Sequence, residues 1–452
     1  NIASNVEECT SAVEDGKNEI IEILNKHEVV KGLTPEKLRA ILEDLGPTYI
    51  KLGQIMSMRS DMIPQAYCDA LTQLRSSVPP MPFDEVRRVV EGSLGKPIEE
   101  VYSDFNEEPI GAASIAQAHE ARLKDGTHVV VKVQREGIYE IMSQDMTLLR
   151  KAAGILKLAP GTGEILDFGI ILDEMWKVSQ EEMNFTIEAQ NAETFYKNNE
   201  DVAFATCPRI YREETTPQVL TMEFIDGISV DNKAKLLENG YDLDEIGAKL
   251  ADNYIKQVIE DGFFHADPHP GNIRIREGEI VWIDMGMMGR LSKRDQALFA
   301  KAVAAVAQHD VEGIKSVVLS IGKCRGKVDH AKLYIDIDEM LSRYGDADLG
   351  GLDLGQLMNE CMDIAREHKI AMPEGVSMLG RGVLTIEGVI ADLSPDTNVI
   401  SIATARAANM AVDKFDVGKE LRSGARFAAE SFKKAMAIPG LLSDSLKSLS
   451  KG

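Results

Sequence analysis

The sequence FFHADPHPGN, residues 263–272, precedes the run EIVWIDMG, residues 279–286, and the two stretches together decide the fold. Proline and glycine punctuate the first stretch, which predicts an ordered loop that carries Asp267 and Asn272. The second stretch holds four consecutive apolar residues before Asp284, which predicts a short buried strand. Two carboxylates and one amide are therefore expected beside the ends of strands.

The spacing of these polar residues matches the requirements of phosphoryl transfer. Asp267 and Asn272 reproduce the H-x-D-x-x-x-x-N spacing of kinase catalytic loops, and Asp284-Met285-Gly286 stands where such enzymes have a metal-binding D-F-G turn. Transfer from ATP needs a cation on the phosphates, magnesium ligands and a group that orients the acceptor. We expect Asn272 and Asp284 to bind Mg²⁺ and Asp267 to orient the attacking hydroxyl or water.

The cation is predicted on a valine-rich strand. In VVVKVQ, residues 129–134, strand alternation places Lys132 on the face opposite Val129, Val131 and Val133. A Lys-Asp-Gly turn signal at 124–126 joins this strand to a preceding one in a hairpin. The order Lys132, then Asp267 with Asn272, then Asp284 predicts a kinase-like ATP site.

A different chemistry is also compatible with the loop. His265, Asp267 and His269 are residue types that bind zinc or iron in hydrolases. That interpretation would leave Lys132 and Asp284 without roles. We therefore interpret His265 as a structural residue that braces the loop.

Two helices are predicted near the N-terminus. Thr34-Pro35 is a helix start signal, and Gly46-Pro47 ends that helix. The next helical stretch carries Lys51 and Gln54, which are three residues apart and share a face. Both side chains are expected to reach one target.

The remaining pattern predicts an α+β protein with a two-lobed, protein-kinase-like fold and a largely helical C-terminal lobe. The expected elements are a helix at 83–94, strands within 109–134, helices from 140 to 200, strands from 208 to 225, a helix at 243–261 and helices from 292 onward, interrupted by a loop at 345–355. The expected domains are an N-terminal helical extension at 1–108, an N-lobe at 109–225, a C-lobe at 226–413 and a basic amphipathic segment at 414–452.

Composition excludes several classes of function. The 50 Lys and Arg against 73 Asp and Glu give a net charge of −23, so we expect no nucleic-acid partner. The five cysteines form no C-x-x-C pair, which argues against a disulfide framework or a zinc site and indicates a cytoplasmic setting. No run reaches the roughly 18 apolar residues of a spanning helix. The basic segment at 414–452 is interpreted as a solvated amphipathic helix or as a contact with a membrane or partner.

The chain resembles the UbiB family of atypical protein-kinase-like proteins, the aarF-domain-containing kinases, from about residue 35 to about residue 400. Lys51-Leu52-Gly53-Gln54 matches the K-x-G-Q motif that marks this family. Residues 111–117, GAASIAQ, are similar to the alanine-rich loop that replaces the glycine-rich phosphate loop of kinases. The resemblance implies nucleotide contacts from the loop residues Ala112, Ala113, Ser114 and Ile115.

The resemblance also assigns roles to acidic and linker residues. Glu188 would pair with Lys132, and Glu182 would belong to an E-x-D motif near the K-x-G-Q helix. Asn184 stands where the family has Asp, so this chain departs from the motif at that position. After the strand near 219–224, the linker between the lobes would contact adenine through backbone groups at Glu223 and Ile225.

The function implied by the resemblance is Mg²⁺-dependent ATP hydrolysis, by an ATPase or atypical kinase, coupled to prenyl-lipid or ubiquinone-type quinone biosynthesis or to lipid handling at a membrane. The implied partners are ATP and a membrane lipid or prenyl-quinone precursor. The resemblance also implies contacts with lipid-biosynthesis proteins and a position peripheral to, or anchored at, a membrane. Ala266 replaces the Arg of H-R-D, no A-P-E follows Asp284, and the K-x-G-Q residues Lys51 and Gln54 would lie over the site. Phosphorylation of proteins in trans is therefore not expected. The alternatives are a phosphotransferase that acts on small molecules, as aminoglycoside and choline kinases do, and a nucleotide-binding scaffold without turnover.

Overall fold

A four-stranded antiparallel sheet, in the order β1-β2-β3-β5, carries Lys132. The computed structural model describes residues 18, 20–60, 63–74, 79–156, 168–344 and 353–417. The strands of this N-lobe sheet are β1 (Tyr102–Ala112), β2 (Ala116–Leu123), β3 (His128–Gln134) and β5 (Val219–Glu223). Val129, Val131 and Val133 are fully buried in one core cluster, whereas Val130, on the face of Lys132, belongs to another. The predicted alternation of β3 is confirmed.

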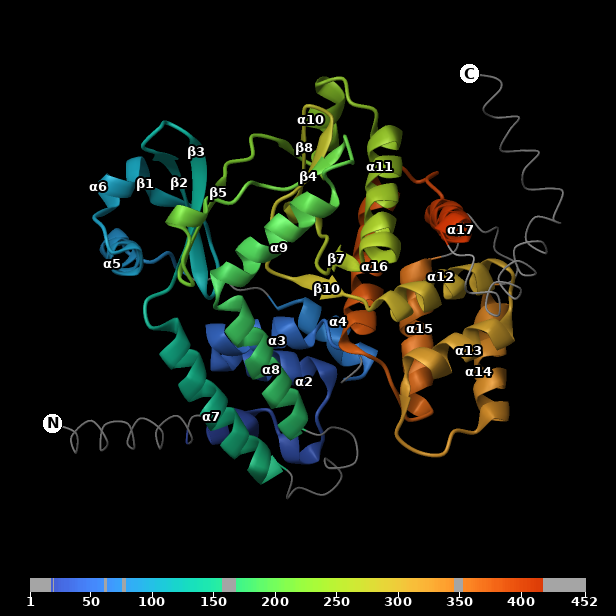
Figure 1. The fold of residues 1–452 in the computed structure, drawn as a ribbon. Helices are drawn as coiled ribbons and strands as arrows, with labels where there is room; N and C mark the ends of the chain where they lie inside the picture. The colour runs from blue at the N-terminus through green and yellow to red at the C-terminus, as the bar shows by residue number, and fades with distance from the viewer. Residues whose placement is uncertain are drawn as a thin grey trace.

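The N-lobe sheet is covered on one face by two short helices. α5 (Phe83–Leu94) and α6 (Ile98–Val101) contribute Val86, Val90 and Ile98 to the cluster that includes the three valines of β3. The predicted hairpin joins β2 to β3, with Gly126 at a φ of 85°, which glycine adopts without strain. Figure 1 shows this sheet with α5 and α6 outside it.

The first strand starts earlier than its pattern predicts. β1 begins at Tyr102, so the expected domain boundary before Pro109 falls inside the strand. Most of β1 is exposed or half-buried and has irregular pairing with β2, because it is the edge of the sheet. Without a buried face, its sequence shows no alternation of apolar residues.

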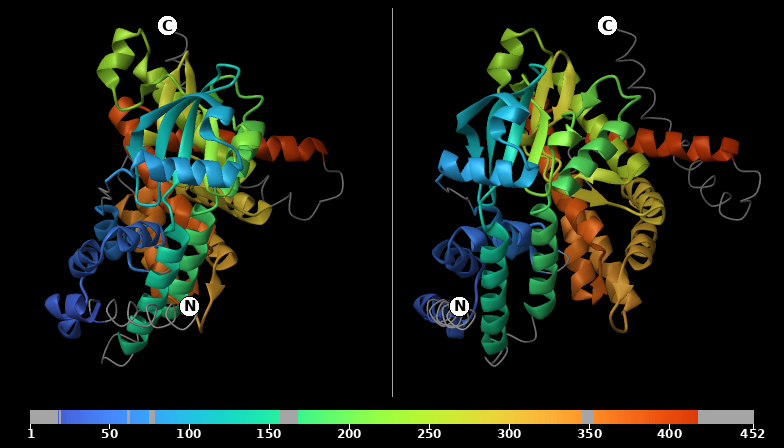
Figure 2. Two further views of the ribbon diagram at one scale, coloured as in Figure 1. Left: turned by 90° about the vertical axis from the view of Figure 1, so that its left-hand side faces the viewer. Right: turned by 60° about the vertical axis from the view of Figure 1, so that its left-hand side comes forward.

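The N-terminal helices form a second core with two helices from the middle of the chain. The Thr34 side chain accepts a hydrogen bond from the Lys37 amide and caps the first of them, as its start signal predicts. Leu52 and Leu71 pack there with Met146 and Met175. The helices are α2 (Pro35–Leu45), α3 (Pro47–Met56), α4 (Gln65–Thr72), α7 (Ile138–Leu156) and α8 (Phe168–Glu182), preceded by the short helix η1 (Val29–Lys31). Figure 2 shows α7 and α8 extending away from the sheet beside the N-terminal helices.

One segment expected in the N-lobe is shared with the C-lobe. After α9 (Phe185–Asn198), the two-residue strand β4 (Ala205–Thr206) pairs in parallel with β9 (Glu279–Trp282). The second sheet has the order β4-β9-β8-β6, with β8 (Ile273–Arg276) and β6 (Ile228–Ser229). The range 109–225 is therefore not one structural unit.

The C-lobe is largely helical and carries the loop at 263–272. Its helices are α10 (Lys233–Glu238), α11 (Leu243–Lys256), a π-helical turn η3 (Gln257–Asp261), α12 (Lys293–Ala307), α13 (Val311–Ile321), α14 (His330–Arg343), α15 (Leu354–Glu367), α16 (Glu374–Leu393) and α17 (Val399–Val417). Its short strands include β7 (Phe263–His265) and β10 (Met288–Arg290), which pair with each other, and β11 (Lys323–Cys324) with β12 (Ile370–Ala371). The C-lobe also contains the 3₁₀ turn η4 (Pro270–Asn272), and another such turn, η2 (Arg212–Glu214), precedes β5. The first three residues of the predicted loop at 263–272 are thus a strand.

Several sequence predictions fall wholly or partly outside the described residues. The basic segment at 414–452 is described only to Val417, and the loop predicted at 345–355 only from Asp353. Cys9 also lies outside, and the four cysteines that are described are free thiols. Within the described part of the chain, every helix is too short or too polar to span a bilayer.

Candidate functional site

Lys132, Glu188 and Asp284 meet from three separate elements. β3 carries Lys132, α9 carries Glu188, and Asp284 follows β9. The Lys132 ammonium donates a hydrogen bond to Glu188 Oε1 at 2.6 Å and lies 3.4 Å from Asp284 Oδ2. The pairing of Glu188 with Lys132 is present as expected.

This cluster keeps Lys132 charged. Burial alone would lower the pKa of Lys132, but the carboxylates of Asp284 and Glu188 outweigh it and raise the pKa well above its usual range. Asp284 has its pKa lowered: burial opposes ionisation, and the Lys132 charge together with a hydrogen bond from the Gly286 amide overcomes it. At neutral pH Lys132 and Asp284 are therefore both charged, whereas burial raises the pKa of Glu188 against the opposing effect of Lys132.

His265 braces the loop, as the sequence suggested. Its Nδ1 accepts a hydrogen bond from the Asp267 amide at 3.2 Å, and its Nε2 donates to the Asp284 carbonyl at 2.5 Å. Burial lowers the pKa of His265, which favours the neutral ring that this pattern requires. One imidazole thus ties the backbone of Asp267 to that of Asp284.

The alternative metal site of a hydrolase is not formed. Both ring nitrogens of His265 are committed to backbone groups, and His269 Nε2 lies 3.7 Å from Asp267 Oδ2. Among the described residues, no three His, Cys, Asp or Glu side chains are grouped to hold a metal ion.

Asn272 lies beside Asp267 in the same loop. Its Nδ2 donates to the Asp267 carbonyl at 3.1 Å, which turns the amide oxygen Oδ1 away from that carbonyl. An amide oxygen and a carboxylate are the hard oxygen donors that Mg²⁺ prefers. Asn272 and Asp284 therefore have the chemistry of magnesium ligands.

Lys51 and Gln54 have different partners. Lys51 Nζ lies 2.7 Å from Glu182 Oε2, at the end of α8, whereas Gln54 Nε2 donates to the Leu74 carbonyl at 3.1 Å. The expectation that both side chains reach one target is wrong, because Gln54 packs on the chain after α4 while the longer Lys51 extends to α8. Burial would lower the pKa of Lys51, but Glu182, with smaller contributions from Asp284 and Asp267, raises it.

The residue that departs from the family motif has a structural role. Asn184 is the N-cap of α9, and its side-chain oxygen accepts hydrogen bonds from the Thr186 amide at 3.1 Å and the Thr186 hydroxyl at 2.6 Å. Asn and Asp stabilise a helix about equally as its N-cap residue. Capping of the helix that carries Glu188 is therefore retained.

The alanine-rich loop joins β1 to β2, and Arg135 holds it by hydrogen bonds to two of its backbone carbonyls. Arg135 donates from Nε to the Ala113 carbonyl at 3.0 Å and from its amide to the Ile115 carbonyl at 2.9 Å. Ser114 is buried, whereas Ala112 and Ala113 are more accessible. Arg135, which directly follows β3, was not predicted from the sequence as a site residue.

In the linker between the lobes, some of the polar groups already form hydrogen bonds within the protein. The Glu223 carboxylate binds Arg276 at 2.7 Å, and its amide donates to the Arg209 carbonyl. Phe224 stacks on His128 with ring centroids 4.0 Å apart. Ile225 follows directly and is half-buried.

Asn191 is a second residue that the sequence analysis did not identify. Its Nδ2 donates to the Met285 carbonyl at 3.0 Å, and its Oδ1 accepts from Arg290 at 3.2 Å. Asn191 is three residues after Glu188, so both project from one face of α9. That spacing was the signal in the sequence that could have identified it.

The chain matches two family models. Residues 73–318 match the ABC1 atypical kinase-like domain, and residues 337–398 match the UbiB helical domain. The first match covers Lys132, Asp267 and Asp284.

Curated relatives and a solved structure are consistent with these matches. A Clostridium pasteurianum protein, described as an uncharacterized protein in the hydrogenase 1 5′ region, is 39% identical over 402 residues, which are 88% of this chain and 76% of that protein. A Marinobacter nauticus protein named probable protein kinase UbiB is 30% identical over 373 residues, 81% of this chain and 68% of that protein. The complex of Rv3197 with erythromycin from Mycobacterium tuberculosis is 24% identical, has a TM-score of 0.55, and covers 80% of this chain and 93% of that one. This last likeness shows the fold alone.

Proposed function

Because the chain belongs to the UbiB family of atypical kinase-like proteins, we propose that it is an ATPase or atypical kinase with a Mg²⁺-dependent site at Lys132, Asp267 and Asp284. The observation that carries the proposal is the meeting of Lys132, Glu188 and Asp284, in which the ammonium lies 2.6 Å and 3.4 Å from the two carboxylates. A half-buried Lys that is kept charged beside a carboxylate on the D-x-G turn is the arrangement that kinases use for phosphoryl transfer from ATP.

Each polar residue has a distinct part in this proposal. The Lys132 ammonium binds the α- and β-phosphates, and Glu188 holds it in position. Asp284 and Asn272 hold Mg²⁺, which when bound neutralises charge on the phosphate oxygens. Asp267 orients the attacking water or hydroxyl and accepts its proton, while His265 fixes the backbone of Asp267 through their hydrogen bond.

The charges around the site support a divalent cation there. Glu182, Glu188, Asp267 and Asp284 provide four carboxylates, while Lys51 and Lys132 provide two ammonium groups. The excess of negative charge favours a bound cation. The same excess of negative charge disfavours the binding of ATP that carries no Mg²⁺.

The contacts with the nucleotide base and with the alanine-rich loop are proposed by analogy with the family. We place the adenine at the linker, against backbone groups of Glu223 and Ile225, and the phosphates under the loop from Ala112 to Ile115. That loop is bound to Arg135 through two of its carbonyls, which favours a stiff cover over the phosphates.

The substrate is proposed to be water or a small acceptor rather than a protein. Lys51 of α3 pairs with Glu182 at 2.7 Å, and the charges of Asp284 and Asp267 also raise its pKa, which supports a place for α3 near the proposed transfer site. A folded protein substrate would have to displace that helix. Coupling to a membrane lipid or a prenyl-quinone precursor, contacts with lipid-biosynthesis proteins and a place at the membrane surface are proposed from the family alone.

The test is release of ADP from ATP as a function of Mg²⁺, with and without vesicles that carry a quinone-precursor mimic. Wild type is compared with Asp284→Asn and Asp267→Asn. Turnover that rises with the vesicles and is lost in both variants supports a membrane-coupled ATPase. Transfer of the γ-phosphate to an added alcohol faster than hydrolysis would instead indicate a small-molecule phosphotransferase, and nucleotide binding without turnover a scaffold.

A further inference from the structure

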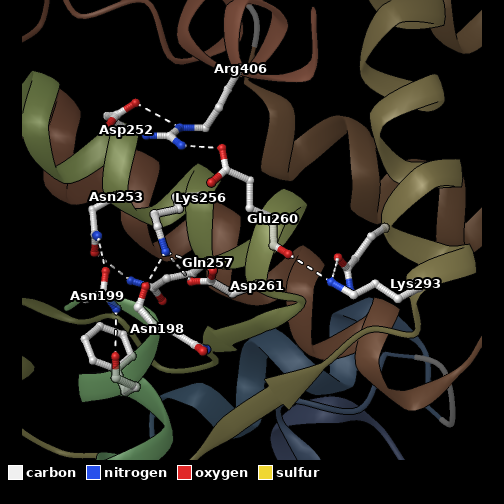
Figure 3. A network of polar contacts seen from close by, with 12 residues as sticks. Asn198, Asn199, Asp252, Asn253, Lys256, Gln257, Glu260, Asp261, Lys293 and Arg406 are labelled. Carbon is white, nitrogen blue, oxygen red and sulfur yellow. Dashed lines mark hydrogen bonds and ion pairs between the residues drawn. The ribbon is translucent and has the colours of Figure 1, made fainter. Parts of the chain in front are cut away.

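Buried amide side chains connect four segments behind the proposed site. Asn199 follows α9, Asn253 lies in α11, Gln257 begins the π-helical turn and Trp282 ends β9. Asn253, Gln257 and Trp282 are fully buried, and Asn199 is 4% exposed. Figure 3 shows the two asparagines and Gln257 side by side.

Each hydrogen bond in this network has a defined donor and acceptor. The reason is that the groups at its two ends, the Trp282 indole N–H and the Phe195 carbonyl, can only donate and only accept. The Trp282 indole can only donate, and it donates to Asn253 Oδ1 at 3.0 Å. Asn253 Nδ2 therefore donates to Asn199 Oδ1 at 2.8 Å, and Asn199 Nδ2 donates to the Phe195 carbonyl at 3.0 Å. Gln257 Nε2 also donates to Asn253 Oδ1, at 2.9 Å.

At Gln257, this network of hydrogen bonds reaches the backbone of the catalytic loop. Because Gln257 Nε2 is committed to Asn253, its Oε1 faces the other way and accepts the backbone N–H of His265 at 3.0 Å. His265 in turn holds the Asp267 amide and the Asp284 carbonyl. One glutamine thus connects the buried amides to the backbone of both proposed catalytic carboxylates.

The helical turn that presents Gln257 is held from its other faces. Lys256 binds both oxygens of Asp261, five residues on, at 2.9 Å, a separation that the π turn brings into register. Lys256 also donates to the Asn198 carbonyl at 2.6 Å, which ties the turn to the end of α9. On the outside, Arg406 of α17 binds Asp252 at 2.7 Å and also contacts Glu260 (Figure 3).

The geometry points to Gln257 as a positioning residue for the catalytic loop, with Asn253 fixing the orientation of its amide. This inference rests on the proposed function, because the reaction that Gln257 serves is the proposed one. Removing Oε1 leaves the His265 amide buried without a partner, an unfavourable state that a shift of the loop can relieve. A displacement of about 1 Å at a catalytic group lowers the rate by about 100-fold.

The experiment compares three variants in the ATPase assay. Gln257→Leu removes the acceptor of the His265 amide. Gln257→Glu keeps that acceptor, and its buried carboxyl favours the protonated form, whose O–H can donate to Asn253. The matched control is Gln296→Leu, which removes another buried C-lobe amide, one that donates to the Leu291 carbonyl.

We expect Gln257→Leu to lower kcat about 10- to 100-fold with KM for ATP changed by less than about threefold, since Lys132 and the linker are untouched. Gln257→Glu should recover most of kcat, and Gln296→Leu should keep it once rates are normalised to folded protein. A wild-type kcat in Gln257→Leu, or an equal loss in Gln296→Leu, overturns the inference.

A second readout does not depend on turnover. Hydrogen exchange of the peptide over residues 263–272 should be at least about tenfold faster in Gln257→Leu than in wild type, and unchanged in Gln296→Leu. If the wild type turns over no ATP, the proposed function fails while this readout still tests the role of Gln257. Unchanged exchange in Gln257→Leu overturns that role.

Discussion

Glu188→Gln should weaken Mg²⁺ binding more than it weakens nucleotide binding. In the wild type, Glu188 holds the Lys132 ammonium at 2.6 Å and keeps it 3.4 Å from Asp284. Without the Glu188 charge, the ammonium is expected to close on Asp284, one of the two proposed Mg²⁺ ligands. Lys132 would then compete with the metal.

The size of the effect follows from the distances. Closing the gap between Lys132 and Asp284 from 3.4 Å to about 2.8 Å gains roughly 1 kcal/mol at an effective dielectric constant of about 20. Because the Asp284 side chain is 43% exposed, solvent screens part of that gain. The Mg²⁺ concentration at half-maximal effect should therefore rise about two- to fivefold.

The assay is a Mg²⁺ titration of nucleotide binding, followed by fluorescence of a labelled ATP analogue. The control is Glu193→Gln, which removes an exposed carboxylate from the same helix, where it pairs with Arg212. A Mg²⁺ midpoint that does not move in Glu188→Gln would refute the reasoning. An equal shift in Glu193→Gln would show that the effect belongs to the helix and not to the contact with Lys132.

Three further predictions concern stability and are measured by denaturant unfolding. Lys51→Met should destabilise the protein by about 1–3 kcal/mol more than the double variant Lys51→Met/Glu182→Gln, since the single change leaves a buried carboxylate unpaired; additive effects would contradict this. Asn184→Ala should cost about 1 kcal/mol through loss of the helix cap and Asn184→Asp close to nothing, so equal costs would count against the capping role. Burial and a hydrogen bond with Asp353 raise the pKa of Glu387 to about 8, so its stabilising effect is present below about pH 4 and declines as the pH rises toward 8. Glu387→Gln should flatten the decline between pH 6 and 8.5, and an unchanged slope would exclude Glu387 as its source.

Local chemistry made much of the fold predictable. The valines of β3, the Gly126 turn and the cap at Thr34 each act over a few residues, and each is found as expected. The proposed site was predictable for the same reason, because Asp267 and Asn272 lie in one loop. Their proposed roles stay predictions.

Contacts between distant segments were not predictable. Asn253 in the amphipathic helix α11 and Gln257 just after it are four residues apart, a pattern that is usual for an exposed polar face. They are buried because partners arrive from Asn199, His265 and Trp282. The π turn likewise leaves no periodic trace in the sequence.

Two strands, β1 and β4, were not predicted correctly because their sequences carry no pattern of alternating buried residues. β1 is the exposed edge of its sheet and has no buried face to impose alternation. β4 has only two residues, and its pairing partner lies in the other lobe.

The short strand β4 has a consequence for how the protein is made. Ala205 pairs with Ile280, which the ribosome adds roughly 75 residues later, at about 5–20 residues per second. During synthesis, β4 therefore leaves the ribosome several seconds before its pairing partner β9. The segment between α9 and β5 cannot reach its final structure until β9 has been made. Two fragments divided at the linker near residue 226 would each lack part of the second sheet, so they should become soluble only when produced together.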